Sequence, residues 1–125
     1  MRKSLTSRPP EHSWRHWSEQ LAACHLQAQG MNLLAGNWTS RRGELDLVMR
    51  DGGTVVFVEV RQRSGSGHGS AAESIGPAKL ARLRHTAAVY LLSEFGTADV
   101  DARIDVVLVS GSSDSFHLQH LRGVA

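Results

Sequence analysis

The sequence predicts a one-domain α/β protein whose elements follow the order α-β-β-β-α-β-β. Two segments with apolar residues at helical spacing predict the helices. Between them, two short runs are joined by Asp51-Gly52-Gly53, and both Asp-Gly and Gly-Gly are strong hairpin signals. The second run, Thr54–Arg61, is apolar on both faces, which is typical of a central strand. A chain of 125 residues is long enough for one self-sufficient core.

The first expected element is a helix over about 14–29, with Ser13 as its N-cap and Gly30 as its stop. Its residues form two apolar sides, so we expect the helix to be largely covered and Cys24 to be a buried thiol. One side contains Trp14, Trp17, Leu21, Cys24 and Ala28, and the other contains Ala22, Ala23 and Leu26 together with Glu19.

A second helix is expected from Pro77 to about Phe95, because proline suits the first turn of a helix and Gly96 can end it. The segment before it, Ser64–Gly76, is rich in Gly and Ser and predicts a loop within the domain. The expected strands span residues 31–38, 44–50, 54–61, 103–109 and 116–121.

The ends of the chain and its composition set the wider expectations. Residues 1–12 are polar and contain two prolines, which predicts a flexible lead-in to a single domain over 13–125. No apolar run approaches the length of a membrane span, and no secretory signal follows the basic N-terminus. The single cysteine excludes an intrachain disulfide. We therefore expect a cytoplasmic protein with no membrane partner.

The predicted hairpin brings charged residues together. If its turn has two central residues, Asp46 and Glu59 lie on the same face in either register. With Gly52-Gly53 as the turn, they are direct cross-strand neighbours, with Cβ atoms about 4.5–5.5 Å apart. Glu44 and Arg61 join this face, because alternate residues of a strand share a face.

Two acidic side chains on a buried strand need compensation, because opposed like charges and desolvated charges are both destabilising. A hard divalent cation, Mg²⁺ or Mn²⁺, is one compensation, with Asp46, Glu59 and Glu44 as candidate oxygen ligands. Such an ion lowers the pKa of a bound water and stabilises charge on a phosphoryl oxygen. The spacing equally allows a salt-bridge network without metal, formed by Glu44, Asp46, Glu59, Arg61 and Arg63.

Four segments resemble a known group of bacterial proteins, the YraN-like uncharacterised family. They lie between Trp14 and Val109, and Gly-Glu-Leu-Asp followed by Val-Glu-Val-Arg at this spacing is fairly specific. The family is placed in the PD-(D/E)xK, restriction-endonuclease-like superfamily and is similar to archaeal Holliday-junction resolvases. The resemblance implies a three-layer fold with a central mixed sheet of four to five strands flanked by helices. The segments are Trp17–Ala23, Asn37-Trp38, Arg42–Leu47 and Val56–Arg61.

The resemblance also implies metal-dependent hydrolysis of phosphodiester bonds in DNA by a nuclease-like domain. Asp46 and Glu59 match the metal-binding acids, and Glu19 matches an acid that resolvase-like members contribute from the first helix. Arg61 falls where the superfamily motif has lysine. Because arginine effectively cannot lose its proton, Arg61 can stabilise a phosphate but is a poor general base. The expected catalytic residues are Asp46, Glu59, Arg61 and Glu19.

The arginine at position 61 supports a second hypothesis, a nucleic-acid-binding module on the same fold that does not hydrolyse its ligand. A structural or protein-interaction role is a third. Resolvase-like relatives act as dimers, so a homodimer is one expected partner state, although no residue of this sequence identifies an interface.

Basic residues near the acidic face are candidates for contact with a nucleic-acid backbone. Arg41, Arg42 and Arg63 lie nearest in the sequence and are the predicted contacts. An ordinary solvated basic surface explains the same residues, and a formal net charge of +2 does not decide between the two. The wider set that could line a groove adds Arg61, Lys79, Arg82 and Arg84.

Overall fold

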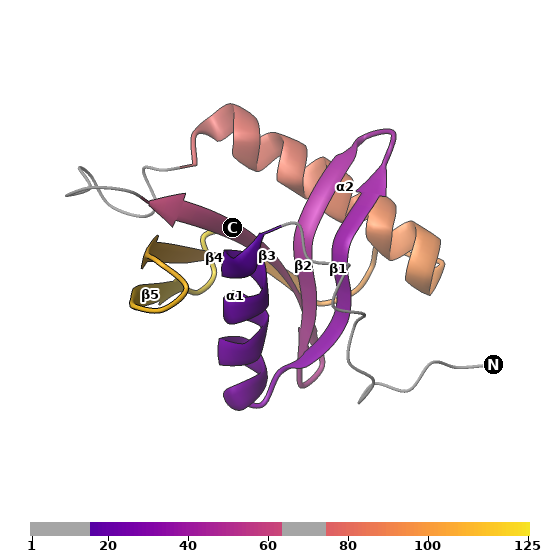
Figure 1. Ribbon diagram of the computed structural model, residues 1–125. Coiled ribbons are helices and arrows are strands. Elements are labelled where there is room, and N and C mark those ends of the chain that lie inside the picture. The colour runs from indigo at the N-terminus through magenta and orange to yellow at the C-terminus, as the bar shows by residue number, and fades with distance from the viewer. Residues whose placement is uncertain (1–15, 64–74) are drawn as a thin grey trace.

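The computed structural model of the protein describes residues 16–63 and 75–125. Its elements follow the predicted order (Figure 1). The predicted lead-in over 1–12 and most of the predicted loop over 64–76 lie outside the described residues. The elements are α1 (Trp17–Ala28), β1 (Asn32–Ser40), β2 (Gly43–Asp51), β3 (Thr54–Arg63), α2 (Pro77–Phe95), β4 (Ala102–Gly111) and β5 (Phe116–Leu121).

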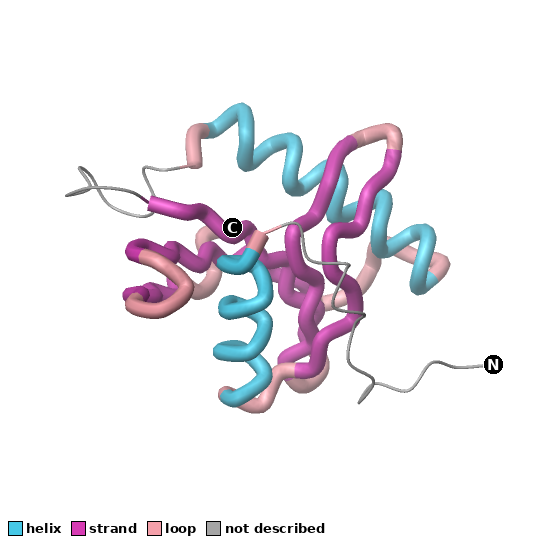
Figure 2. The backbone as a smooth tube through the Cα atoms, viewed as in Figure 1, coloured by secondary structure: helices cyan, strands magenta, loops and turns pink. Residues whose placement is uncertain are grey.

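The strands form one open mixed sheet in the order β1-β2-β3-β4-β5 (Figure 2). β3 and β4 are parallel, whereas the other neighbouring pairs are antiparallel. A parallel pair needs a crossover connection, and α2 lies in it. β3 takes the central place in the sheet, as its apolar character on both faces predicts.

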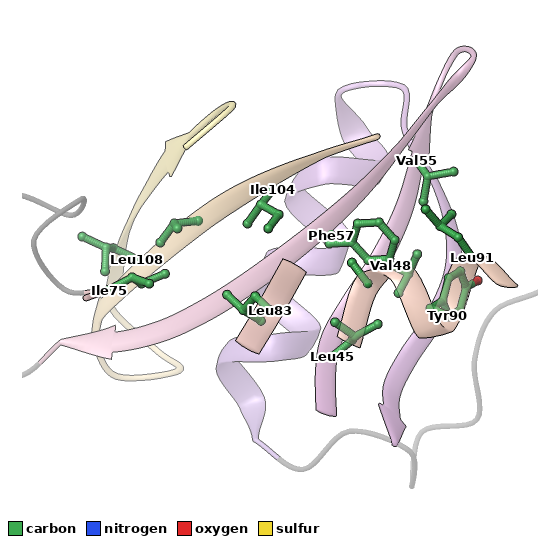
Figure 3. Packing of buried hydrophobic residues seen from close by; sticks show 12 residues of the cluster. Leu45, Val48, Val55, Phe57, Ile75, Leu83, Tyr90, Leu91, Ile104 and Leu108 are labelled. Carbon is green, nitrogen blue, oxygen red and sulfur yellow. The ribbon is translucent and has the colours of Figure 1, made fainter. Parts of the chain in front are cut away.

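α1 and α2 cover opposite faces of the sheet, which confirms the expected layers of helix, mixed sheet and helix (Figure 1). On the α2 face, Leu83 and Tyr90 pack with Phe57 in the cluster drawn in Figure 3. On the α1 face, Leu26 packs with Val58. β3 therefore sends alternate side chains to the two helices. Neither described helix is long and apolar enough to cross a membrane.

The β2–β3 hairpin turns at Gly52-Gly53, which confirms one of the two predicted registers. Asp51 pairs with Thr54 across the turn, and the ladder continues as far as Leu47 opposite Val58. Gly52 has a φ of 62°, a left-handed conformation that this turn requires and that glycine adopts without a steric penalty.

α1 differs from the sequence expectation in its start and in the side that it buries. His16, rather than Ser13, is the N-cap, and its ring accepts the Ser18 N–H at 3.2 Å. The predicted stop is confirmed, because Gly30 follows the helix with a φ of 99°. The side that packs on the sheet contains Ser18, Glu19, Ala22, Ala23 and Leu26.

The prediction that Cys24 is buried is wrong, because Cys24 is exposed. Its stripe has helical spacing, and apolar spacing alone does not say which of two sides meets the core. α1 packs on the sheet with its small residues, which allow a close approach. Cys24 and Ala28 of the other stripe are exposed, whereas its Trp17 and Leu21 are half-buried at the edge of the core.

A buried ionic network ties the hairpin to the last strands. Asp105 on β4 is fully buried and accepts hydrogen bonds from Arg103 Nε and from the Gly123 N–H, each at 2.9 Å. His120 Nε2 lies 2.8 Å from its other oxygen. Arg103 also donates to Asp51 at 3.1 Å. Sequence reasoning treated Asp105 only as part of an apolar strand, so the whole network was missed.

Replacing Asp105 with Asn should lower the free energy of unfolding by about 3 kcal/mol, because removing one charge of a buried pair leaves its partners uncompensated. Urea unfolding at neutral pH measures this change. Asp114→Asn is the matched control, because Asp114 is exposed in the β4–β5 connection. A loss no larger than that of the control would show that the network does not stabilise the fold.

Candidate active site

Asp46 lies where β2 and β3 stop pairing. The ladder of the hairpin ends at Leu47 and Val58, one residue short of the predicted pair of Asp46 and Glu59. Beyond that point, the Asp46 Oδ2 accepts the Val60 N–H at 2.9 Å. The carboxylate thus takes the place of a backbone acceptor between the two strands, which fixes its position relative to β3.

A local break in strand alternation accompanies Asp46. Leu45 packs in the cluster under α2, whereas Leu47 packs in the cluster under α1. Residues two apart in a regular strand share a face, so the alternation changes between them. The residue of β1 that faces Asp46 is Asn37, because the neighbouring pairs are Gly36 with Leu47 and Trp38 with Leu45. Asn37 has a φ of 52°. Asn tolerates this conformation better than most residues.

Glu59 is the buried acid of the site, with 6% of its surface exposed. Two cations approach the same carboxylate oxygen, Oε2. Arg61 Nη1 lies 3.6 Å away, and Lys79 Nζ, from the first turn of α2, lies 3.4 Å away. Both cationic side chains are about 40% exposed, so their charged ends reach solvent while they neutralise a buried acid.

Burial raises the pKa of the Glu59 carboxyl from 4.5 to about 6, and the neighbouring Asp46 charge adds to the rise. Lys79 and Arg61 oppose it, but their positive charges do not cancel the loss of hydration. Two cations beside Glu59 therefore compensate only part of the cost of burying its charge. A carboxyl with a raised pKa beside a second carboxylate is typical of functional sites.

The structure brings together some of the predicted residues and not others. The charges that act on Glu59 are those of Asp46, Lys79 and Arg61. Glu19 lies on the buried side of α1, which covers the other face of the sheet. Glu44 is exposed. Because the alternation of β2 changes between Leu45 and Leu47, the rule that every second residue shares a face no longer places Glu44 beside Glu59.

Asp46 and Glu59 are the residues best placed to hold a cation. Within residues 16–63 and 75–125, no group of three or more His, Cys, Asp or Glu side chains is placed to hold a metal ion. A centre of two carboxylates suits Mg²⁺, which keeps several of its waters and takes one or two protein carboxylates. The buried Glu59, whose lost hydration is only partly compensated, therefore fits such an ion together with Asp46.

Lys79 is the site residue that the predicted catalytic set missed. It belongs to the wider basic set, but only the packing of α2 on the sheet places it beside Glu59. The available signal was its position in the first turn after Pro77. Of the predicted nucleic-acid contacts, Arg41 and Arg42 are exposed in the β1–β2 turn. The side chain of Arg63 lies outside the described structure.

The fold and site define a class: an α/β domain with paired carboxylates at the end of its central hairpin. A family model described as "Uncharacterised protein family UPF0102" matches residues 18–109. A UPF0102 protein of Frankia casuarinae is 46% identical over 108 residues, which cover 86% of this chain and 91% of that protein.

Two further relatives give the same picture. A UPF0102 protein of Pseudomonas aeruginosa is 47% identical over 108 residues, or 86% of each chain. One of Mycolicibacterium smegmatis is 46% identical over 109 residues, which cover 85% of this chain and 87% of that protein. The chain belongs to the UPF0102 family, which confirms the predicted YraN-like family.

Replacing Glu59 with Gln should stabilise the metal-free protein at pH 8 by about 2 kcal/mol. The folded protein binds the Glu59 proton more tightly than the unfolded chain, because the folded pKa is about 6 and the ordinary value is 4.5. The protonated Glu59 carboxyl therefore contributes its full share to the free energy of unfolding below pH 4.5. This contribution is lost as the pH rises through about 6, where the folded protein releases the proton.

Urea unfolding of both proteins in chelator at pH 4 and at pH 8 measures the effect, and the difference should be small at pH 4. Glu94→Gln is the matched control, since Glu94 is an exposed acid on α2. A Glu59→Gln protein that is less stable than the wild type at pH 8 would contradict the account of the site.

Proposed function

We propose that this protein is a metal-dependent nuclease of the PD-(D/E)xK type that hydrolyses phosphodiester bonds in DNA. The observation that carries the proposal is the buried Glu59 carboxyl, held beside Asp46 with a pKa raised to about 6. Two adjacent acids, one of them buried, raise each other's energy, and a bound divalent cation would relieve that cost. The resemblance to resolvase-like proteins supports the same activity.

Asp46 and Glu59 would hold Mg²⁺ or Mn²⁺. When bound, the ion would supply an activated water and charge stabilisation at the phosphate. The chain contributes the orientation of its ligands: the Val60 N–H fixes Asp46, and packing of Phe57 under α2 fixes the strand that carries Glu59. Glu19 and Glu44 remain candidates for assistance from outside this pair.

Lys79 and Arg61 would stabilise the negative charge of the phosphate. Both are ion-paired to the Glu59 Oε2 at distances longer than a strong charged hydrogen bond, and both side chains are partly exposed. They can therefore turn toward a phosphate without leaving the site. Arg61 stands where the superfamily motif has lysine. Lys79 would supply an ammonium group to the same site, but from α2 rather than from β3.

One observation favours a second function, a DNA-binding module that does not cut. Asp46 and Glu59 carry two negative charges, and Arg61 and Lys79 carry two positive charges, so the described site balances its charge without a metal ion. In this case the exposed arginines would bind DNA and the centre would only hold α2 on the sheet. The cytoplasmic location and the homodimer stay predictions in either case.

Calorimetric titration with Mn²⁺ should give one saturable binding event in the wild type and none in Asp46→Asn or Glu59→Gln, because each change removes one of two carboxylate ligands. Asp114→Asn should bind as the wild type does. The same variants, incubated with labelled duplex, branched and single-stranded DNA, should lose metal-dependent cleavage. DNA binding without Mn²⁺ binding or product would replace the nuclease with the binding module.

Lys79→Gln should lower kcat by about 100-fold, because one group that stabilises transition-state charge is removed. Lys79→Arg keeps the charge and should retain part of the rate. Steady-state cleavage gives kcat and KM separately, and KM should change much less than kcat. Arg84→Gln is the control, because Arg84 lies on the opposite flank of α2. A wild-type kcat in Lys79→Gln would exclude Lys79 from the reaction.

A further inference from the structure

The β1–β2 turn meets α2 at one buried hydroxyl. Thr86 on α2 is 2% exposed, and its Oγ1 donates its proton to the Arg82 carbonyl at 2.9 Å, while the Arg42 carbonyl lies 3.4 Å from the same oxygen. The backbones of Arg42 and Arg82 therefore lie on either side of the same oxygen. Two residues that are 40 positions apart in the chain are held at one junction.

Gly43 makes this close approach possible. Its φ is 152°, and a Cβ at this position would lie 2.7 Å from the Thr86 Oγ1. That oxygen belongs to a short, buried side chain that has no room to withdraw. The junction is thus built around a residue without a side chain, which fixes the turn against α2.

Arg42 and Arg82 both occupy exposed positions at this junction. Arg41 beside them is also exposed. The neighbouring cation on α2, Lys79, is the one that pairs with Glu59. Like charges held close together repel each other unless an anion lies between them.

The junction is continuous with the candidate active site. Lys79 lies three residues before Arg82, so the two are neighbours on the surface of α2. Lys79 contacts Glu59, and Arg82 flanks the Thr86 junction. Positive charge consequently runs from the carboxylate pair, along one flank of α2, to the β1–β2 turn.

We propose that Arg42 and Arg82 form a phosphate subsite that holds the sugar-phosphate backbone of a nucleic acid as it leaves the Asp46–Glu59 centre. The subsite recognises the charge and spacing of phosphate groups and not the base sequence, because its two guanidinium groups would contact the phosphates and not the base edges. It rests on the nucleic-acid ligand of the proposed function, but it does not require hydrolysis.

The test is fluorescence anisotropy of a short labelled DNA duplex, with and without Mn²⁺, over a series of salt concentrations. In Arg42→Ala/Arg82→Ala, the slope of log K against log salt should become shallower by about two, because two phosphate contacts are lost. Affinity at low salt should fall by about tenfold or more. Mn²⁺ binding by calorimetry should stay at the wild-type level.

Arg84→Ala is the matched control. Residues advance by about 100° round a helix, so Arg84 lies about 200° from Arg82, on the flank away from the junction. Its salt slope should stay within experimental error of the wild type. Gly43→Ala provides a second variant with every arginine retained: it displaces the turn from α2 and should weaken DNA binding without changing the charge.

The outcomes separate this inference from the nuclease. Wild-type affinity and slope in Arg42→Ala/Arg82→Ala, or an equal loss in Arg84→Ala, would overturn the subsite. A wild-type protein that binds no DNA would also overturn it. Reduced DNA binding in the double variant of a protein that neither binds Mn²⁺ nor cuts DNA would support the subsite and overturn the nuclease.

Discussion

The hydrogen bond from the Val60 N–H to Asp46 joins the two strands of the central hairpin at the point where their own ladder has ended. The Asp46 carboxylate accepts the hydrogen bond that a backbone carbonyl would accept in a continuous ladder, and its second oxygen stays available to another partner. Glu59 precedes Val60 and points to the α2 face, so one short contact sets the position of both acids. Everything that we infer about the site depends on this arrangement.

Electrostatics then decides what the site can do. Loss of hydration at Glu59 outweighs the help of Lys79 and Arg61, so the folded chain holds an acid that is easier to protonate than in water. Groups with perturbed pKa values cluster at functional sites, and structural ion-pair networks produce them as well. The same sheet holds Asp105 more completely buried, but there every oxygen has partners of the chain's own. The two acids differ in how fully the fold compensates them.

Local signals in the sequence predicted the frame of this site well. The Gly52-Gly53 turn sets the register, and the apolar run of β3 sets its central place in the sheet. The break at Asp46 could not be predicted, because no residue of β2 signals it; in the structure it lies opposite Asn37, which has a φ of 52°. Lys79 was missed as a site residue for a similar reason: helical spacing says which residues share a side, but only tertiary packing says what that side meets. The prediction that Cys24 is buried failed for the same reason, because helical spacing did not show which side of α1 meets the sheet.

The most direct test of the central claim is paramagnetic broadening of amide NMR signals by Mn²⁺ in isotope-labelled protein. If Asp46 and Glu59 converge on one cation, the amide signals of Glu59 and Val60 should be the first to broaden, at low ratios of metal to protein. Sharp signals from these two residues, while amides elsewhere broaden or none change, would contradict the account.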